Sequence, residues 1–212
     1  MGLNWAGFRR GWQNGAVTES PAQLAELEAF FAQLSREPDF DAPELLAYDA
    51  ADLLLLQAAL ERLNFVSGSA CSVKSGTVVT IGDRHGALTL GAAKVLGATG
   101  IRVHQDPLLS ERALAANVER LQLGADPASV FAHHPLGGAL LEGAKLVLLQ
   151  LPKSLAELEE ISYSVARFAD PDVVLLAGGR DKHMSRGMNE VLARHFDDVT
   201  ASRGWQIGRA HV

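Results

Sequence analysis

The sequence predicts an α/β protein built on one mostly parallel sheet, and three observations lead to this fold class. From Thr77 onward, short segments rich in valine, isoleucine and leucine alternate with longer segments of helical character. The longer segments have the length of the helices that connect parallel strands. Two short apolar segments, separated only by Arg203 to Gln206, close the chain and predict a terminal antiparallel pair.

Two helices are expected before the sheet. The first begins at Ser20, a capping residue, places Pro21 in its first turn and ends near Pro38. The second covers Leu45 to Leu63, which carries acidic residues early and an arginine late, as the helix dipole favours. A small polar loop, Val66 to Ser75, then leads to the sheet.

The alternating part of the chain gives the remaining elements. Strands are expected at Thr77 to Ile81, Ile101 to His104, Ser129 to Ala132, Leu146 to Leu151, Asp172 to Leu176, Val199 to Ser202 and Ile207 to Val212. Helices are expected at Ala87 to Ala98, Leu109 to Leu123, Ser154 to Ala169 and Met184 to His195.

Composition predicts a globular chain that can bury one core. Of its 212 residues, 48% are apolar and only 8 are proline. The net charge of −6 repels a phosphate backbone, so nucleic-acid binding requires a local basic patch or another domain. Neither a membrane span nor a signal peptide is predicted, and we expect a cytoplasmic protein. Cys71 is the single cysteine, which excludes an internal disulfide framework.

The segment Val78 to Gly86 is the first candidate site. A β-branched strand enters a turn with Gly82 and Gly86, as in Rossmann-like sheets that bring the backbone close to a cofactor. Arg84 lies between these glycines, where its guanidinium repels a cationic cofactor. The alternative is that both glycines only form a tight strand-to-helix turn.

Two further strand ends carry candidate residues. Asp106 follows the second strand, where an acidic residue binds ribose hydroxyls in nucleotide-binding folds. Its alternative role is to cap the helix that starts after Pro107. The fourth strand ends in Gln150 to Lys153, where amino-group methyltransferases carry Asn-Pro-Pro and an aromatic residue. Lys153 has no aromatic face, so no catalytic residue is predicted there, and it is either a solvated lysine or a phosphate contact.

The loop that follows the next strand is the most basic in the chain. Arg180, Lys182 and Arg186 make it the best candidate for an anion or RNA contact, with a solvated loop as the alternative. The adjacent histidines His133 and His134 lack the spacing of metal ligands on one helix face, so no metal site is predicted.

Taken in order, these motifs resemble the N-terminal domain of two-domain ribosomal RNA guanine-N2 methyltransferases of the "methyltransferase small" class. The resemblance covers residues 42 to 212 and leaves residues 1 to 41 as an N-terminal arm and helix. The segments that carry it are Tyr48 to Asp52, Val79 to Leu90, Gln150 to Leu155 and Gly179 to Asn189.

The resemblance implies two tandem copies of the class I methyltransferase fold, of which the first is degenerate and the second holds S-adenosylmethionine and the Asn-Pro-Pro-Phe motif. This chain ends at Val212, about where the second copy is expected to begin. The resemblance therefore implies that this chain is a non-catalytic domain, which binds no cofactor, supports its own C-terminal catalytic domain and helps to bind ribosomal RNA. The implied remnants of the cofactor site are Gly82, Gly86 and Asp106, and the implied RNA contacts are Arg84, Lys153, Arg180, Lys182 and Arg186.

Two alternatives remain open from the sequence. The domain itself could bind S-adenosylmethionine and methylate a substrate. It could also be an interaction domain that forms a homodimer through the aromatic arm Trp5 to Trp12.

Overall fold

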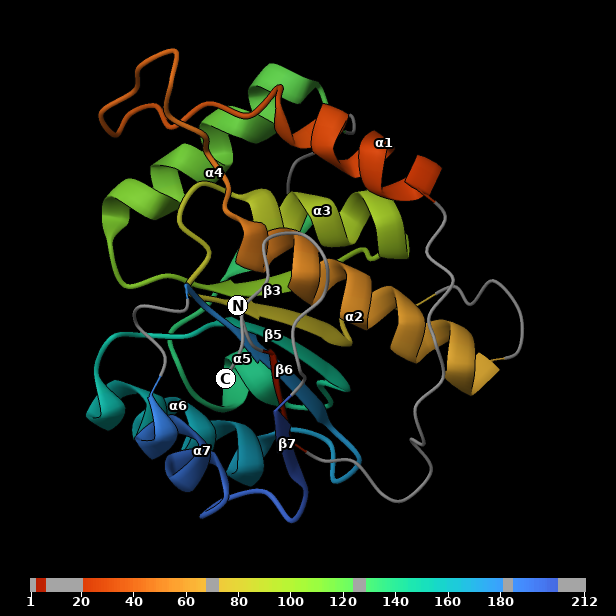
Figure 1. The fold of residues 1–212 in the computed structure, drawn as a ribbon, viewed down its shortest axis with the longest axis vertical. Coiled ribbons are helices and arrows are strands. Elements are labelled where there is room, and N and C mark those ends of the chain that lie inside the picture. The colour runs from red at the N-terminus through yellow and green to blue at the C-terminus, as the bar shows by residue number, and fades with distance from the viewer. Residues whose placement is uncertain (1–2, 7–20, 68–72, 124–128, 181–184, 202–212) are drawn as a thin grey trace.

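The computed structural model describes residues 3–6, 21–67, 73–123, 129–180 and 185–201. Within these ranges the chain forms one seven-stranded sheet with helices on both faces (Figure 1). The predicted α/β class with a mostly parallel sheet is confirmed. None of the helices in the described ranges combines the length and apolar content that crossing a bilayer requires.

The strands are β1 (Leu3–Ala6), β2 (Val78–Ile81), β3 (Ile101–His104), β4 (Phe131–His133), β5 (Leu146–Gln150), β6 (Val174–Gly178) and β7 (Val199–Ala201). The helices are α1 (Pro21–Phe31), α2 (Ala50–Ser67), α3 (Ala87–Leu96), α4 (Leu108–Leu121), α5 (Gly138–Leu141), α6 (Leu155–Phe168) and α7 (Arg186–Leu192). The strand order is β4-β3-β2-β5-β6-β1-β7, and the pairs from β4 to β6 are all parallel.

The antiparallel part of the sheet differs from the expectation. Strand β1 lies between β6 and β7 and runs antiparallel to both, with Trp5 opposite Leu176 and Thr200. The described partner of β7 is thus β1, while the expected last strand, Ile207 to Val212, lies outside the described residues. A four-residue strand among glycines carries too little pattern to be found from sequence, because its partners are distant in the chain.

Helix α1 is shorter than expected, because it ends at Phe31 instead of continuing towards Pro38. The amides of Gln33 and Leu34 bond to carbonyl oxygens three residues back, which tightens the chain into a closing turn. The part of the predicted dimerising arm from residue 7 to residue 12 lies outside the described residues.

Helix α2 begins five residues later than expected because a reciprocal cap forms at Asp49. The Asp49 carboxylate accepts a hydrogen bond from the Ala51 amide at 2.8 Å, and the Asp52 carboxylate accepts one from the Asp49 amide at 2.8 Å. Each side chain satisfies an amide that the first helical turn leaves without a partner. At its other end α2 continues to Ser67, so the expected loop from Val66 starts later.

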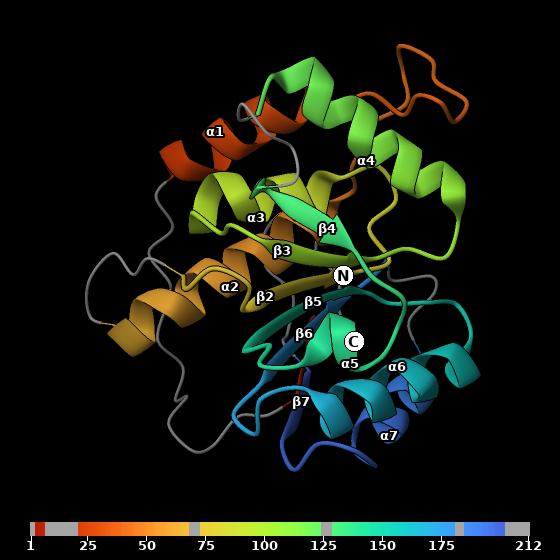
Figure 2. The ribbon, with the colours of Figure 1, turned by 180° about the vertical axis from the view of Figure 1, so that it is seen from behind.

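The central strands are buried on both faces, and successive residues contribute to two separate cores. Helices α1 to α4 cover one face of the sheet and α5 to α7 the other (Figure 2). Val78 and Leu148 belong to the core on the first face, while Val79 and Leu149 belong to the core on the second. Phe31 of α1 is 1% exposed and belongs to the first of these cores. The predicted division of the chain after residue 41 stays a prediction.

Candidate functional site

The candidate site lies at the carboxyl ends of β2, β3 and β5, the edge at which parallel α/β sheets bind ligands. Two hollows meet there. The larger, which we call the cleft, has a volume of about 360 Å³. The smaller, which we call the side pocket, has a volume of about 50 Å³ and lies towards the start of α2. Asp83, Arg84 and Gln150 line both hollows.

Most of the residues singled out from sequence gather at this edge. Gly82, Arg84, Asp106 and Lys153 line the cleft, although they come from three different strand ends. Arg180 lines the side pocket instead. Among the remaining predicted residues, Gly86 lies under α4, Arg186 is exposed at the start of α7, and Lys182 lies outside the described residues.

Both glycines of the β2–α3 turn are required by the fold itself. Gly82 has φ +78°, and a Cβ on it would lie 3.1 Å from the carbonyl oxygen of Gln150. Gly86 has φ +96°, and a Cβ there would lie 2.8 Å from Cδ1 of Leu114. Positive φ and close approach each favour glycine, so the tight-turn interpretation accounts for both residues without a ligand.

A carboxylate of the chain occupies the start of α3. Asp83 is 1% exposed and accepts hydrogen bonds from the amides of Gly86 at 2.9 Å and Thr89 at 2.8 Å. Burial raises the pKa of Asp83 in spite of these bonds. Such amides are the groups that a helix start offers to an anionic part of a ligand, and here they are already used. Thr80, at the position where cofactor-binding strands often carry an acidic residue, has its hydroxyl 2.8 Å from that of Thr89.

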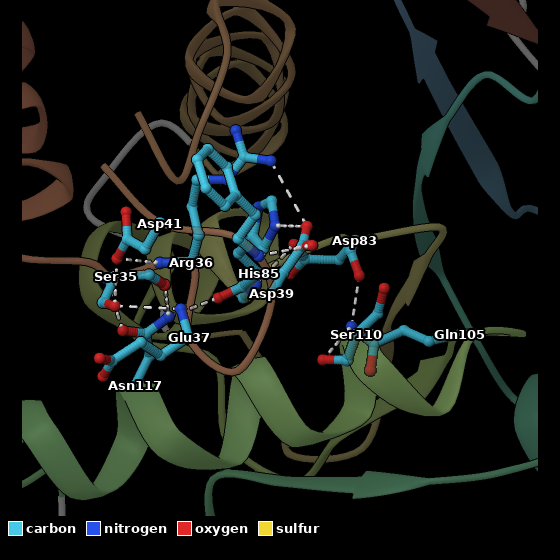
Figure 3. Close-up of polar contacts among 12 residues, drawn as sticks. Ser35, Arg36, Glu37, Asp39, Asp41, Asp83, His85, Gln105, Ser110 and Asn117 are labelled. Atoms are coloured by element: carbon cyan, nitrogen blue, oxygen red, sulfur yellow. Dashed lines mark hydrogen bonds and ion pairs between the residues drawn. The ribbon is translucent and has the colours of Figure 1, made fainter. Parts of the chain in front are cut away.

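The segment after α1 covers this turn, which sequence reasoning missed (Figure 3). Asn117 of α4 is fully buried, accepts a hydrogen bond from the Ser35 amide and donates to the carbonyl oxygens of Ser35 and His85, all within 2.9 Å. Nε2 of His85 lies 3.4 Å from Oδ2 of Asp39. The amide of Phe40, and then His85, lower the pKa of Asp39. This network fixes the covering segment against the β2–α3 turn.

Gln105 is a second residue that sequence reasoning missed. It is buried at the end of β3, and its amide nitrogen donates to the carbonyl oxygens of Asp83 and Ser110 (Figure 3). The turns after β2 and β3 are therefore linked to each other. No local sequence signal announces such a contact, because it depends on the parallel register of the two strands.

The capping role considered for Asp106 is wrong. Helix α4 begins at Leu108 with Pro107 at its cap position and no side-chain cap. The Asp106 carboxylate instead lies 3.3 Å from Nε2 of His104, whose Nδ1 donates to the carbonyl oxygen of His134 at 3.1 Å. The carboxylate is 75% exposed at the cleft, so it is accessible to hydroxyl groups of a ligand.

The β5–α6 turn directs Gln150 away from the role expected of a methyltransferase motif. Its side-chain amide donates to the carboxylate of Asp52, which is 2% exposed. Burial, followed by the neighbouring carboxylates of Asp49 and Asp83, raises the pKa of Asp52 well above its usual value. The amide of Gln150 is thus engaged with α2, whereas Lys153 is exposed at the mouth of the cleft.

The cations at this edge fall into two groups. Within the described ranges, Arg84 and Lys153 have neither an ion pair nor a side-chain hydrogen bond. Arg180 has its Nε 3.3 Å from the carboxylate of Asp49, the cap residue of α2. Arg84 and Lys153 are therefore the cations of the cleft that remain available to a ligand.

The cleft is also lined by carboxylates, which we call the acidic wall. Glu157 and Glu160 of α6 line it together with Asp106. Burial, and then the carboxylates of Asp106 and Glu160, raise the pKa of Glu157. In the described parts of the chain, no three His, Cys, Asp or Glu side chains converge as metal ligands do.

Comparison with protein families gives one match that covers most of the chain. The model described as the RLMG N-terminal domain matches residues 23–210. The ribosomal RNA large subunit methyltransferase G of Pseudomonas fluorescens is 32% identical over 182 residues, which are 84% of this chain and 45% of that protein. The protein of the same name from Shewanella denitrificans is 25% identical over 180 residues, 84% of this chain and 44% of that protein. The chain therefore spans less than half the length of the curated relatives it matches.

Solved structures agree on the fold. A Thermus thermophilus 16S rRNA methyltransferase, solved with AdoMet and guanosine, has a TM-score of 0.50 and 23% identity over 71% of this chain and 39% of that one. A ribosomal protein methylase of Lactobacillus delbrueckii has a TM-score of 0.50 and 16% identity over 70% of this chain and 69% of that one. Both similarities confirm the Rossmann-like methyltransferase architecture predicted above.

Proposed function

Because this chain belongs to the RLMG N-terminal domain family, we propose that it is the non-catalytic N-terminal domain of an S-adenosylmethionine-dependent ribosomal RNA (guanine-N2) methyltransferase. In this proposal the domain acts in the cytoplasm, supports a C-terminal catalytic domain and contributes contacts to ribosomal RNA. The proposal has two parts, the absence of cofactor chemistry and the presence of RNA contacts, and different residues support each part.

The β2–α3 turn is the observation that carries the first part. Asp83 occupies the amides at the start of α3, and Arg84 adds a guanidinium at the mouth of the cleft. A working cofactor turn needs free amides, and a guanidinium beside a sulfonium is repulsive. This turn thus offers S-adenosylmethionine neither free amides for the anionic part of the ligand nor a favourable electrostatic environment for its sulfonium.

The β5–α6 turn supports the same conclusion for the substrate side. The amide of Gln150 donates to Asp52, and Lys153 occupies the position at which a stacking side chain holds a flipped base. The turn from Gln150 to Lys153 contains no aromatic ring that could stack on a target base.

Calorimetry with S-adenosylmethionine tests the first part. The 212-residue chain is expected to give no saturable heat at millimolar cofactor. The cleft has a size typical of small-molecule sites, about 300–1,000 Å³, and this favours the alternative that the chain binds the cofactor itself. A saturable heat with the native chain would overturn this first part of the proposal, and tighter binding in an Arg84→Glu variant would place the sulfonium beside Arg84.

The second part rests on cations at the same edge of the sheet. Arg84, Lys153 and Arg186 are exposed and unpaired in the described part of the chain, while Arg180 is paired with Asp49. Unpaired surface cations bind phosphates with a strong dependence on salt. We expect Arg84, Lys153 and Arg186 to contribute more than Arg180, and Lys182 completes the proposed set.

Binding to a ribosomal RNA fragment tests this part by comparing two variants of equal charge. The first replaces the five proposed contacts by glutamine, and the control replaces five cations that line neither hollow: Lys74, Lys94, Arg112, Arg120 and Arg167. The first variant is expected to weaken binding by at least about tenfold more than the control and to flatten its salt dependence. Equal losses in the two variants would mean that only net charge matters and would remove the proposed contact surface.

A further inference from the structure

The cleft contains a combination of groups that the fold does not use and of which the proposed RNA contacts use only the cations. It has two cations that are unpaired in the described part of the chain, Arg84 and Lys153, three carboxylates on its acidic wall, and an apolar floor. The cofactor turn beside it is filled by Asp83, yet the cleft itself is open. A ligand that fits here must therefore differ in charge from S-adenosylmethionine.

The two cations belong to turns that touch each other. A Cβ on Gly82 would lie 3.1 Å from the carbonyl oxygen of Gln150, so the turn after β2 packs directly on the turn after β5. Arg84 follows Gly82 by two residues and Lys153 follows Gln150 by three, and both side chains line the cleft. A guanidinium and an ammonium that line one cleft, neither with a carboxylate partner in the described part of the chain, suit one phosphate group.

The acidic wall determines which chemical groups the rest of a phosphate-bearing ligand can have. Asp106, Glu157 and Glu160 accept hydrogen bonds from hydroxyl and amino groups but repel further phosphates. The exposed carboxylate of Asp106 stands at the end of β3, where ribose hydroxyls bind in nucleotide-binding sheets. The ligand therefore has one anionic end and one end rich in hydrogen-bond donors.

The floor of the cleft suits a base. It is aliphatic and is formed by Ile81, Leu136, Leu149, Leu151 and Ile161. Flat heterocycles pack on such surfaces, and a volume of about 360 Å³ lies in the range of small-molecule pockets.

We propose that the cleft binds a 5′-phosphorylated ribonucleotide, with the phosphate between Arg84 and Lys153 and the ribose hydroxyls at Asp106. The nucleotide is either free or one unit of an RNA strand, since both sources present the same chemistry. The free-nucleotide source is independent of the function proposed above, and the RNA source rests on it.

Calorimetry with ligands of matched structure tests the phosphate and the sugar separately. Adenosine 5′-monophosphate is expected to bind the 212-residue chain at least about tenfold more tightly than adenosine, because its phosphate adds charge-assisted contacts to Arg84 and Lys153. S-adenosylmethionine, with the same adenosine group and a sulfonium, is expected to bind more weakly than adenosine. The 2′-deoxy monophosphate is expected to bind more weakly than the ribonucleotide, and adenosine triphosphate more weakly than the monophosphate because of the acidic wall.

Variants assign these differences to residues. Arg84→Gln and Lys153→Gln are each expected to weaken monophosphate binding about tenfold without changing adenosine binding. Asp106→Asn is expected to reduce the difference between the ribonucleotide and its 2′-deoxy form. Arg167→Gln is the matched control, since Arg167 lies in the last turn of α6 and lines neither hollow. Thermal unfolding of each variant verifies that the fold is intact.

A short single-stranded oligoribonucleotide separates the two sources. If it displaces the monophosphate and loses affinity in Arg84→Gln, the nucleotide comes from RNA. If it leaves the monophosphate bound, the site takes the free nucleotide. The site is overturned if the monophosphate gives no saturable heat at millimolar concentration, or if the monophosphate and adenosine bind equally. Failure of the RNA contacts alone, with monophosphate binding intact, contradicts the proposed function and leaves this site in place.

Discussion

The β2–α3 turn and the β5–α6 turn leave neighbouring parallel strands at the same edge of the sheet, but they use their polar groups differently. In the first turn, the amides bond to the buried carboxylate of Asp83, and both glycines are fixed by close neighbours. In the second turn, Gln150 is tied to α2, while Lys153 remains exposed and unpaired in the described part of the chain. Substitutions of the buried residues of the first turn should therefore reduce stability, and those at the exposed end of the second should affect only ligand binding.

The largest effect is expected at Gly86. An alanine there would hold a left-handed φ and place its Cβ 2.8 Å from Leu114, so Gly86→Ala should lower the free energy of unfolding by about 2–4 kcal/mol. Urea unfolding measures this loss. Gly97→Ala is the matched control, because Gly97 also has a positive φ but nothing within 4 Å of its Cβ position, and about 1 kcal/mol is expected. Equal losses would show that the close approach to α4 contributes nothing.

Asn117 tests whether the first turn depends on the segment that covers it. Asn117→Ala leaves the amide and carbonyl of Ser35 and the carbonyl oxygen of His85 without their partner, and should lower the free energy of unfolding by about 2–3 kcal/mol. Hydrogen exchange should then increase at residues 35–41 and 83–86 together. If exchange increases at only one of these segments, the coupling between them is refuted.

The contribution of Asp52 to the free energy of unfolding should depend on pH, and the direction of its pKa shift sets the sign. Burial raises its folded pKa above the usual value of 3.8, so its contribution to stability is greatest below pH 3.8 and is lost as pH rises through the folded pKa. The free energy of unfolding of the native chain, relative to Asp52→Asn, should therefore fall as pH rises from below 3.8 towards neutrality. Chemical unfolding of both proteins across this interval measures the gap, and a constant gap would mean that Asp52 does not titrate as proposed.

The smallest effect on stability is expected at the exposed end of the second turn. Lys153→Gln removes an unpaired surface cation and should change the free energy of unfolding by less than about 0.5 kcal/mol. The same urea experiment measures it. A loss comparable to that of Gly86→Ala would remove the distinction between the two turns.

Sequence patterns predict the larger part of this fold because its signals are local. Strand β3 begins and ends at the predicted residues, and Ser154 caps α6 by accepting a hydrogen bond from the Glu157 amide. The gathering of Gly82, Arg84 and Lys153 at one cleft follows from a general rule, since parallel strands end at the same edge.

The parts that sequence reasoning missed depend on partners far apart in the chain. The contact of Asn117 with Ser35 spans 82 residues, and that of Gln150 with Asp52 spans 98. The pairing of Arg180 with Asp49 spans 131 residues and changes the availability of a predicted RNA contact. A spacing rule cannot predict such pairs, because they are set by how the layers pack.

The position of β1 determines the order in which the sheet can be completed. Strand β1 is synthesised first, but its neighbours β6 and β7 are the last strands of the described chain. During translation, residues 3–6 have no partner until residues 174–201 have left the ribosome, so the edge of β6 closes only after synthesis of nearly the whole domain. Any tether that holds back residues 3–6 acts on this last step, and it leaves β6 as an open edge that can pair with another chain.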